Sequence, residues 1–386
     1  MSIILKFING LLIDSSDYQI AVRGIDTTLQ ANQTTNFTAS WGNIYAVDAS
    51  ASSISVILPA SSTIQTGNTV VIRRIDTSAN NVTIISNGTE IFDTTHTNAI
   101  ALQLKIGGSA TIRCTGTKPA IVGWSNPKSI NKLWTPSLLT RAIDIDFSTP
   151  ELGALSTLAN TGTLGGNVVQ ATGSKQPTID VADATGVKGC LFDGVDDELR
   201  SSIALPLGTA YTLFGVFRQN ASGVQTPIFT DEYTPDSNIN YAMGVSTGTG
   251  EYTATANTFG GGHFNGAWRK TTGLGYTLGS FGFAAVRYDG ANMKLRLNGD
   301  TEQLTAQTSN PSVSTSVMHI GSNYYATPTA YTNMRLFRIL GFTSAITDGN
   351  VENLEGWSAW NHNQVGLLSS GHTYKNVPPI ITIASY

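Results

Sequence analysis

Short runs of alternating apolar and polar residues, separated by turn residues, constrain this chain more than any other feature. From residue 40 to about 124 such runs recur at close spacing, for example at 53–58, 69–75 and 81–85. No amphipathic helical window lies between them. Because side chains alternate between the two faces of a strand, each run predicts a short, half-buried strand. The region is therefore predicted to be a small all-β sandwich or barrel.

The region from Leu133 to about 376 continues this pattern with longer apolar runs. Residues 211–218 and 281–288 carry the densest strand signals, and an Asn-Gly pair at 298–299 predicts a hairpin turn. A single short helix is predicted near 347–361, because Thr347 or Asp348 can cap it and apolar residues then recur on one side. This second region is also predicted to be all-β.

Turn-rich segments divide the chain. Residues 125–132 break the strand pattern and predict a linker. Lys6 and the Asn9-Gly10 pair interrupt the first apolar stretch, which favours two short strands over an export signal. The predicted parts are N-terminal strands or an attachment arm at 1–39, a small β-domain at 40–126, a linker at 127–132, a larger domain at 133–376 and a C-terminal tail at 377–386.

Composition excludes several functional classes. Charged residues make up 12% of the chain and the net charge is −4, so the cationic stripe that nucleic-acid binding requires is absent. No apolar run approaches the length of about 18 residues that a membrane-spanning helix needs. Cys114 and Cys190 fall in different predicted domains, which favours two buried thiols over a disulfide.

Asp193, Asp196 and Asp197 form the densest acidic cluster, with Glu198 beside them. Carboxylate oxygens suit Ca²⁺, but the spacing is not the regular one of an EF-hand loop. Asp193 and Asp197 can instead cap turns around Gly194 by accepting backbone N–H groups. The structural interpretation is favoured, with Ca²⁺ as the weaker alternative, and no other cofactor or metal is expected.

No residue is assigned a catalytic role. A glycosidase needs two carboxylates facing each other across the scissile bond, whereas Glu232, Glu251 and Glu302 are isolated among turn residues. The five histidines show no metal-site spacing. The chain is therefore predicted not to be an enzyme, although two carboxylates from distant strands remain an alternative.

Aromatic residues in two segments rich in Gly, Asn and Ala are the candidate ligand-binding residues. Residues 259–268 contain His263 and Trp268, and residues 323–331 contain Tyr324 and Tyr325. Sugars present C–H faces that stack on rings and hydroxyls that pair with amides, so such loops suit a glycan. The alternative is that these rings close the sandwich core or form a contact between subunits.

Three motifs resemble those of concanavalin A-like, laminin-G-type jelly-roll domains of microbial and phage surface proteins. They are the F-D-G-x-D-D-x-L signature within 188–199, the hairpin at 288–299, and the closing helix and loop at 354–360 and 370–376. Residues 40–124 are similar to small β-domains of phage tail-fibre and other virion appendage proteins, through the V-V-I-R-R-I-D and V-T-I runs that follow a Leu-Pro pair.

The resemblance implies a subunit of a phage virion appendage, such as a tail fibre or spike. The N-terminal region would join other virion proteins, and the jelly roll would recognise a host-surface glycan. The resemblance further implies a homotrimer, assembled in the host cytoplasm and exposed on the virion, without membrane insertion. A structural capsid fibre or decoration protein without a receptor and a polysaccharide-degrading enzyme are the alternatives.

Overall fold

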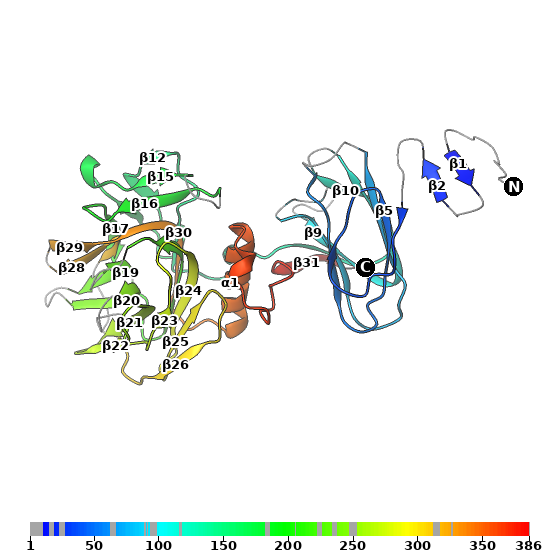
Figure 1. The fold of residues 1–386 in the computed structure, drawn as a ribbon. Helices are drawn as coiled ribbons and strands as arrows, with labels where there is room; N and C mark the ends of the chain where they lie inside the picture. The colour runs from blue at the N-terminus through cyan, green and yellow to red at the C-terminus, as the bar shows by residue number, and fades with distance from the viewer. Residues whose placement is uncertain are drawn as a thin grey trace. The chain divides into compact units, whose positions relative to one another are not determined.

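The computed structural model describes the chain in two compact units, Met1–Trp134 with Asn376–Tyr386, and Thr135–Lys375. The described residues are 11–14, 19–22, 28–61, 67–88, 90, 92, 99–115, 118–181, 186–204, 206–221, 226–233, 238–246, 253–311, 317–325 and 327–385. Their regular structure is nearly all β, which confirms the predicted fold class (Figure 1). The predicted Asn9-Gly10 turn lies outside these residues, and a hairpin of β1 (Leu11–Asp14) and β2 (Gln19–Val22) follows it.

The smaller unit is built from consecutive strands that alternate between two ladders around one core. Within each ladder the strands run parallel. One ladder is β3 (Thr28–Leu29), β5 (Asn43–Val47) and β7 (Thr69–Arg74), and the other is β4 (Phe37–Thr38), β6 (Ile54–Ile57) and β8 (Val82–Ile85). Buried side chains of both ladders, such as Val47, Ile72 and Ile84, share one hydrophobic cluster. The chain therefore coils through successive pairs of strands rather than folding back in hairpins.

Two long antiparallel strands, β9 (Ala99–Cys114) and β10 (Pro119–Leu133), close this unit. The first half of β9 pairs with β8 and the second half with β7, so β9 bends from one ladder to the other. Gly107 (φ 70°) on β9 and Asn126 (φ 43°) on β10 adopt left-handed backbone conformations at this bend. At Gly108 a Cβ would lie 2.8 Å from the Asn126 carbonyl oxygen, so the close approach of the two strands requires glycine.

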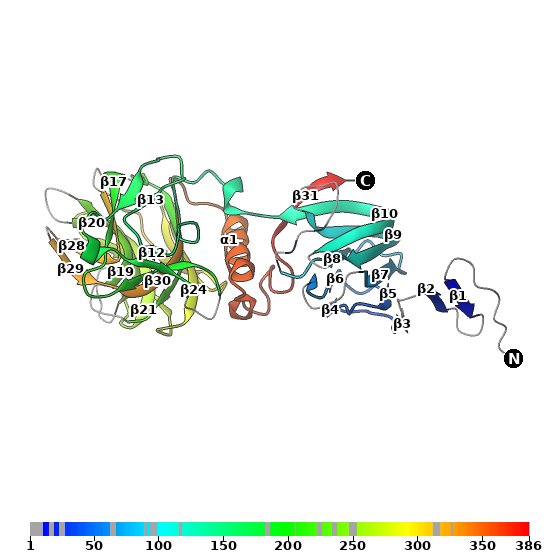
Figure 2. The same cartoon turned by 90° about the horizontal axis from the view of Figure 1, so that it is seen from above.

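The predicted linker at 127–132 is wrong, because these residues lie within β10. Pro127 sits at a register shift, where a missing N–H group does not interrupt the ladder, and Ile130 is fully buried. The predicted tail contains β31 (Ile380–Ser385), which pairs with β10 (Figure 2). Along the chain, the boundaries between the two units lie at residues 134–135 and 375–376.

The described residues of the larger unit form two nine-stranded antiparallel sheets. The first sheet has the order β12 (Gly153–Ala154), β15 (Thr178–Asp180), β16 (Gly189–Asp193), β30 (Asn333–Phe342), β18 (Tyr211–Gln219), β24 (Phe281–Tyr288), β25 (Asn292–Leu297) and β26 (Gln303–Ala306), with β11 (Ile143–Asp146) paired to β30. The second has the order β13 (Thr157–Ala159), β14 (Asn167–Val169), β17 (Leu199–Ala204), β27 (Val317–Ile320), β19 (Thr226–Tyr233), β20 (Asn238–Ser246), β21 (Thr258–Phe264) and β22 (Trp268–Lys270), with β23 (Leu274–Gly275) paired to β21. A further hairpin joins β28 (Ser322–Tyr325) and β29 (Thr327–Tyr331).

Side chains of both large sheets meet in one hydrophobic core, which makes this unit the predicted jelly-roll sandwich. Phe217 of β18 and Phe259 of β21, one from each sheet, stack with ring centroids 5.0 Å apart. The two densest sequence signals became β18 and β24, which pair along their length. The predicted turn after β25 is also present, with Asn298 (φ 55°) and Gly299 (φ 74°) in the left-handed region.

The predicted helix is α1 (Asp348–Asn361), which follows β30. The Thr347 hydroxyl accepts the Asn350 N–H at its N-terminus, as expected for an N-cap. Glu355 is fully buried and accepts two hydrogen bonds from the Arg296 guanidinium of β25, at 2.9 and 2.7 Å. His372 Nε2 lies 3.1 Å from the same carboxylate. Within the described parts of the chain, no helix is long and apolar enough to cross a membrane.

Candidate functional site

Trp268 and Phe264 form an accessible ring pair at the edge of the second large sheet. The two residues face each other across the β21–β22 register, with ring centroids 6.0 Å apart and planes at 74°. Both side chains are half-buried, and the Asn265–Ala267 turn beside them is exposed. Figure 1 shows β22 at the margin of its sheet. We call Phe264, Asn265 and Trp268 the ring platform.

Small residues beneath Trp268 explain how the platform is held. The Trp268 ring packs against Ala242 of β20, which is fully buried. Ala242 pairs with Gly262 of β21, and a Cβ at Gly262 would lie 2.2 Å from the Arg269 carbonyl oxygen of β22. Glycine is therefore required for β22 to pair closely with β21. The edge strand, and with it Trp268, is positioned by sheet pairing rather than by a free loop.

His263 does not belong to the platform, contrary to the prediction. It lies on β21 between Gly262 and Phe264, so strand alternation directs its side chain to the opposite face, where it is fully buried. Its Nε2 lies 2.7 Å from the Ser309 carbonyl oxygen, and its Nδ1 lies 3.2 Å from the Tyr211 hydroxyl.

Burial, together with the Arg269 charge, lowers the pKa of His263 to about 4 despite the hydrogen bond to Ser309. His263 is therefore neutral at pH 7. Since a carbonyl oxygen can only accept, Nε2 carries the proton and Nδ1 accepts from the Tyr211 hydroxyl. This histidine is a core residue that links the two sheets.

Tyr324 and Tyr325 lie on β28, and their side chains fall outside the described residues. Their contribution to a ligand site stays a prediction.

The acidic cluster shapes a turn. Asp193 Oδ1 accepts the Val195 and Asp196 N–H groups, and Asp197 Oδ2 accepts the Asp193 N–H at 2.9 Å. These bonds confirm the predicted turn-capping role around Gly194. Ligand oxygens of the three aspartates lie within 4.8 Å of one another, and Ca²⁺ binding stays a prediction. Burial, with the like charges of the other two aspartates, raises the pKa of Asp197 even though it accepts a backbone N–H.

A second polar cluster, which sequence reasoning missed, joins Glu198, His319 and Ser322 inside the larger unit. All three are buried. The Ser322 hydroxyl donates to Glu198 Oε2 at 3.1 Å, and His319 Nδ1 lies 3.7 Å from the same oxygen. Burial tends to raise the pKa of Glu198, but the interactions with His319 and Ser322 outweigh it and lower the pKa.

This cluster differs from a catalytic triad, in which the serine hydroxyl is hydrogen-bonded to the histidine. Here the Ser322 hydroxyl and the His319 ring both lie against the Glu198 carboxylate. The arrangement joins the residue that precedes β17 to β27 and β28, and no spacing in the sequence signals it.

Comparisons with known proteins give only distant likenesses. No family model matches this chain, and no curated protein matches it. Domain 4 of AbnA, a GH43 extracellular arabinanase from Geobacillus stearothermophilus in complex with arabinotriose, is similar at 12% identity over 56% of this chain and 98% of that one, with a TM-score of 0.42. The receptor binding domain of botulinum neurotoxin D is similar at 7% identity over 56% and 52%, with a TM-score of 0.39.

A botulinum neurotoxin type C structure is also similar, at 10% identity over 57% of this chain and 51% of that one, with a TM-score of 0.40. Cell entry of that toxin depends on interaction with two ganglioside molecules. The chain spans about half the length of both toxin structures. At such identities and TM-scores these likenesses establish neither a family nor a function for this chain. The assignment of the larger unit as a jelly-roll sandwich rests on its own two sheets and shared core.

Proposed function

We propose that this chain is a subunit of a phage virion appendage, a tail fibre or spike, whose larger unit binds a host-surface glycan without cleaving it. The observation that carries the glycan part is the ring platform. A half-buried tryptophan, a second ring and an exposed amide lie together on a paired edge strand.

The platform offers the two interactions that a sugar needs. The accessible part of the Trp268 ring can stack on the C–H face of a pyranose, and the exposed Asn265 turn can pair with hydroxyls. The Asn265 Nδ2 group donates to the Asn310 carbonyl oxygen at 2.5 Å, which holds the turn and leaves its amide oxygen as an acceptor. Because the platform stands on a sandwich, little ordering is needed on binding.

The partners of the buried carboxylates support adhesion rather than hydrolysis. Among the described residues of the larger unit, Asp144 is engaged by Arg141 and Arg338, and Glu355 by Arg296. Asp197 caps a turn and Glu198 interacts with His319 and Ser322. A retaining or inverting glycosidase needs one carboxyl group free to give a proton and a second free to act on the sugar.

Single sugar contacts on an open surface are weak, so the proposal includes several copies per appendage. Linking copies converts later binding events into intramolecular ones and raises the apparent affinity. A homotrimer, with the smaller unit attached to other virion proteins and the larger unit exposed on the virion, would provide this.

A glycan array probed with the full chain tests the proposal. We expect binding to a limited set of host-surface glycans, and Trp268→Ala should weaken it by roughly 2- to 13-fold per site, on the range of aromatic stacking energies. Trp268→Phe should retain part of the binding. Trp124→Ala, which removes a tryptophan that is 39% exposed in the smaller unit, should leave binding unchanged. Absence of binding to every glycan would favour a structural fibre or decoration protein.

A further inference from the structure

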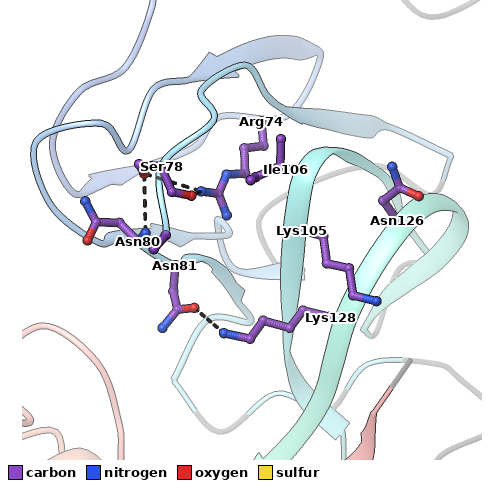
Figure 3. A pocket seen from close by; sticks show the side chains of 9 residues that line it. Arg74, Ser78, Asn80, Asn81, Lys105, Ile106, Asn126 and Lys128 are labelled. Carbon is purple, nitrogen blue, oxygen red and sulfur yellow. Dashed lines mark hydrogen bonds between the residues drawn. The ribbon is translucent and has the colours of Figure 1, made fainter.

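The bend of the β9–β10 pair in the smaller unit contains an open pocket of about 460 Å³ (Figure 3). This volume lies within the range of roughly 300–1,000 Å³ that is usual for small-molecule sites. Three segments line it, namely the turn after β7, the β9 bend and the β10 bulge. Its lining residues are Arg74, Ser78, Ala79, Asn80, Asn81, Lys105, Ile106, Asn126 and Lys128. We call it the corner pocket.

Arg74 forms a rigid wall of the corner pocket and is not a free charge. Its guanidinium is 4% exposed and bonds Asp76 through both Nε and Nη2, at 3.2 and 2.9 Å. It also donates to the carbonyl oxygens of Leu104 and Ser78. Burial tends to raise the pKa of Asp76, but hydrogen bonds from Arg74 and Ser78 hold it well below its usual range. The ion pair therefore contributes no net charge.

Two lysines give the corner pocket a positive charge in a chain whose net charge is −4. Lys105 and Lys128 come from the two neighbouring strands, and none of the lining residues is acidic. Lys128 Nζ donates to Asn81 Oδ1 at 2.6 Å, which orients the amine and leaves the Asn81 Nδ2 group as a donor. The pocket thus presents cationic and amide donors beside the exposed apolar side chains of Ala79 and Ile106.

We propose that the corner pocket binds a carboxylate or phosphate group carried on a hydroxylated carbon skeleton, that is, an acidic or phosphorylated monosaccharide. Lys105 and Lys128 neutralise the anionic group, the Asn81 and Asn126 amides pair with hydroxyls, and Ile106 contacts the carbon skeleton. The site is separate from the ring platform and does not depend on the function proposed for it.

Lysine NMR tests this proposal on the full chain. Reductive ¹³C-methylation labels all ten lysines while preserving their charge, and Lys105→Arg and Lys128→Arg each remove one signal and so assign it. The probes are glucuronate, glucose 6-phosphate, inorganic phosphate and glucose. We expect glucuronate or glucose 6-phosphate to shift the Lys105 and Lys128 signals saturably, and glucose not to shift them.

Charge variants give the second measurement. Lys105→Gln should weaken binding of the effective probe by roughly two- to fivefold, as for an exposed ion pair. Arg113→Gln, which removes an exposed cation on the same strand outside the pocket, should leave binding unchanged. Added salt should weaken binding because the lysines are exposed.

Three results would overturn the proposal. Glucose could shift the two signals as strongly as glucuronate, or all lysine signals could move together without saturating. Inorganic phosphate could also bind as tightly as glucose 6-phosphate, which would remove the role of the sugar skeleton.

Discussion

Replacing Glu355 by glutamine should destabilise the larger unit strongly, because this carboxylate anchors α1 to the sandwich. Glu355 is fully buried and accepts hydrogen bonds from Nε and Nη2 of Arg296, with His372 as a further partner. Removing one member of a buried ion pair costs about 3–5 kcal/mol, since the remaining charge stays buried without compensation. The Arg296 side chain keeps 11% exposure and glutamine retains one acceptor, so we expect the lower end, about 3 kcal/mol.

A loss of about 3 kcal/mol corresponds to a fall in Tm of about 6–12 °C for a unit of this size, at about 2–4 °C per kcal/mol. Differential scanning calorimetry of the full chain measures it, with unfolding of the smaller unit as an internal reference. Glu352→Gln is the matched control on the same helix. The Glu352 carboxylate is 33% exposed and lies 3.8 Å from Arg296, so its loss should cost at most about 1 kcal/mol. Equal Tm shifts for the two variants would refute the anchoring role of Glu355.

Three further predictions follow from buried groups. The pKa of His263, about 4 against the usual 6.5, means that protonation favours unfolding. Stability should be constant above about pH 6.5 and fall by roughly 3 kcal/mol as the pH drops to about 4, and denaturant unfolding of His263→Gln should show a weaker pH dependence. Gly262→Ala should lower stability by about 1–3 kcal/mol in thermal unfolding, because the added Cβ meets the backbone of β22. Cys114 and Cys190 are buried free thiols and should react with a thiol reagent only after unfolding.

A denaturation midpoint that does not change between about pH 7 and about pH 5 would oppose the assignment of His263. Gly275→Ala, whose Cβ meets nothing within 4 Å, should be neutral, and an equal loss in both glycine variants would refute the close-approach argument. Prompt labelling of either thiol in the folded protein would contradict its burial.

Local signals in the sequence predicted the larger unit well. The Thr347 cap and the Asn298-Gly299 turn depend only on residues a few positions away in the sequence. Their structures can therefore be inferred without knowing which strands pair. The parallel coils of the smaller unit could not be inferred in this way. Thr28 pairs with Asn43 whereas Ile44 pairs with Val71, so the coils differ in length and leave no fixed period.

The errors in the predicted linker and in the candidate site also have specific causes. Asn126 and the proline after it are usual loop residues, but here they form a bulge inside a strand, which sequence composition cannot distinguish from a linker. His263 and Trp268 share a glycine-rich segment, and only the register of β21 and β22 decides which side chain reaches the surface. The corner pocket depends on a bent strand pair that brings Lys105 and Lys128 to one site, and no local sequence pattern encodes this placement.

Binding to purified host-surface polysaccharide, followed by sizing of that polysaccharide, shows whether the larger unit binds glycan through Trp268 without cleaving it. We expect the full chain to be retained on the polysaccharide and retention to fall in Trp268→Ala. The polysaccharide should keep its chain length after prolonged incubation. Shortened chains, or retention that is the same without the tryptophan ring, would contradict the proposed function.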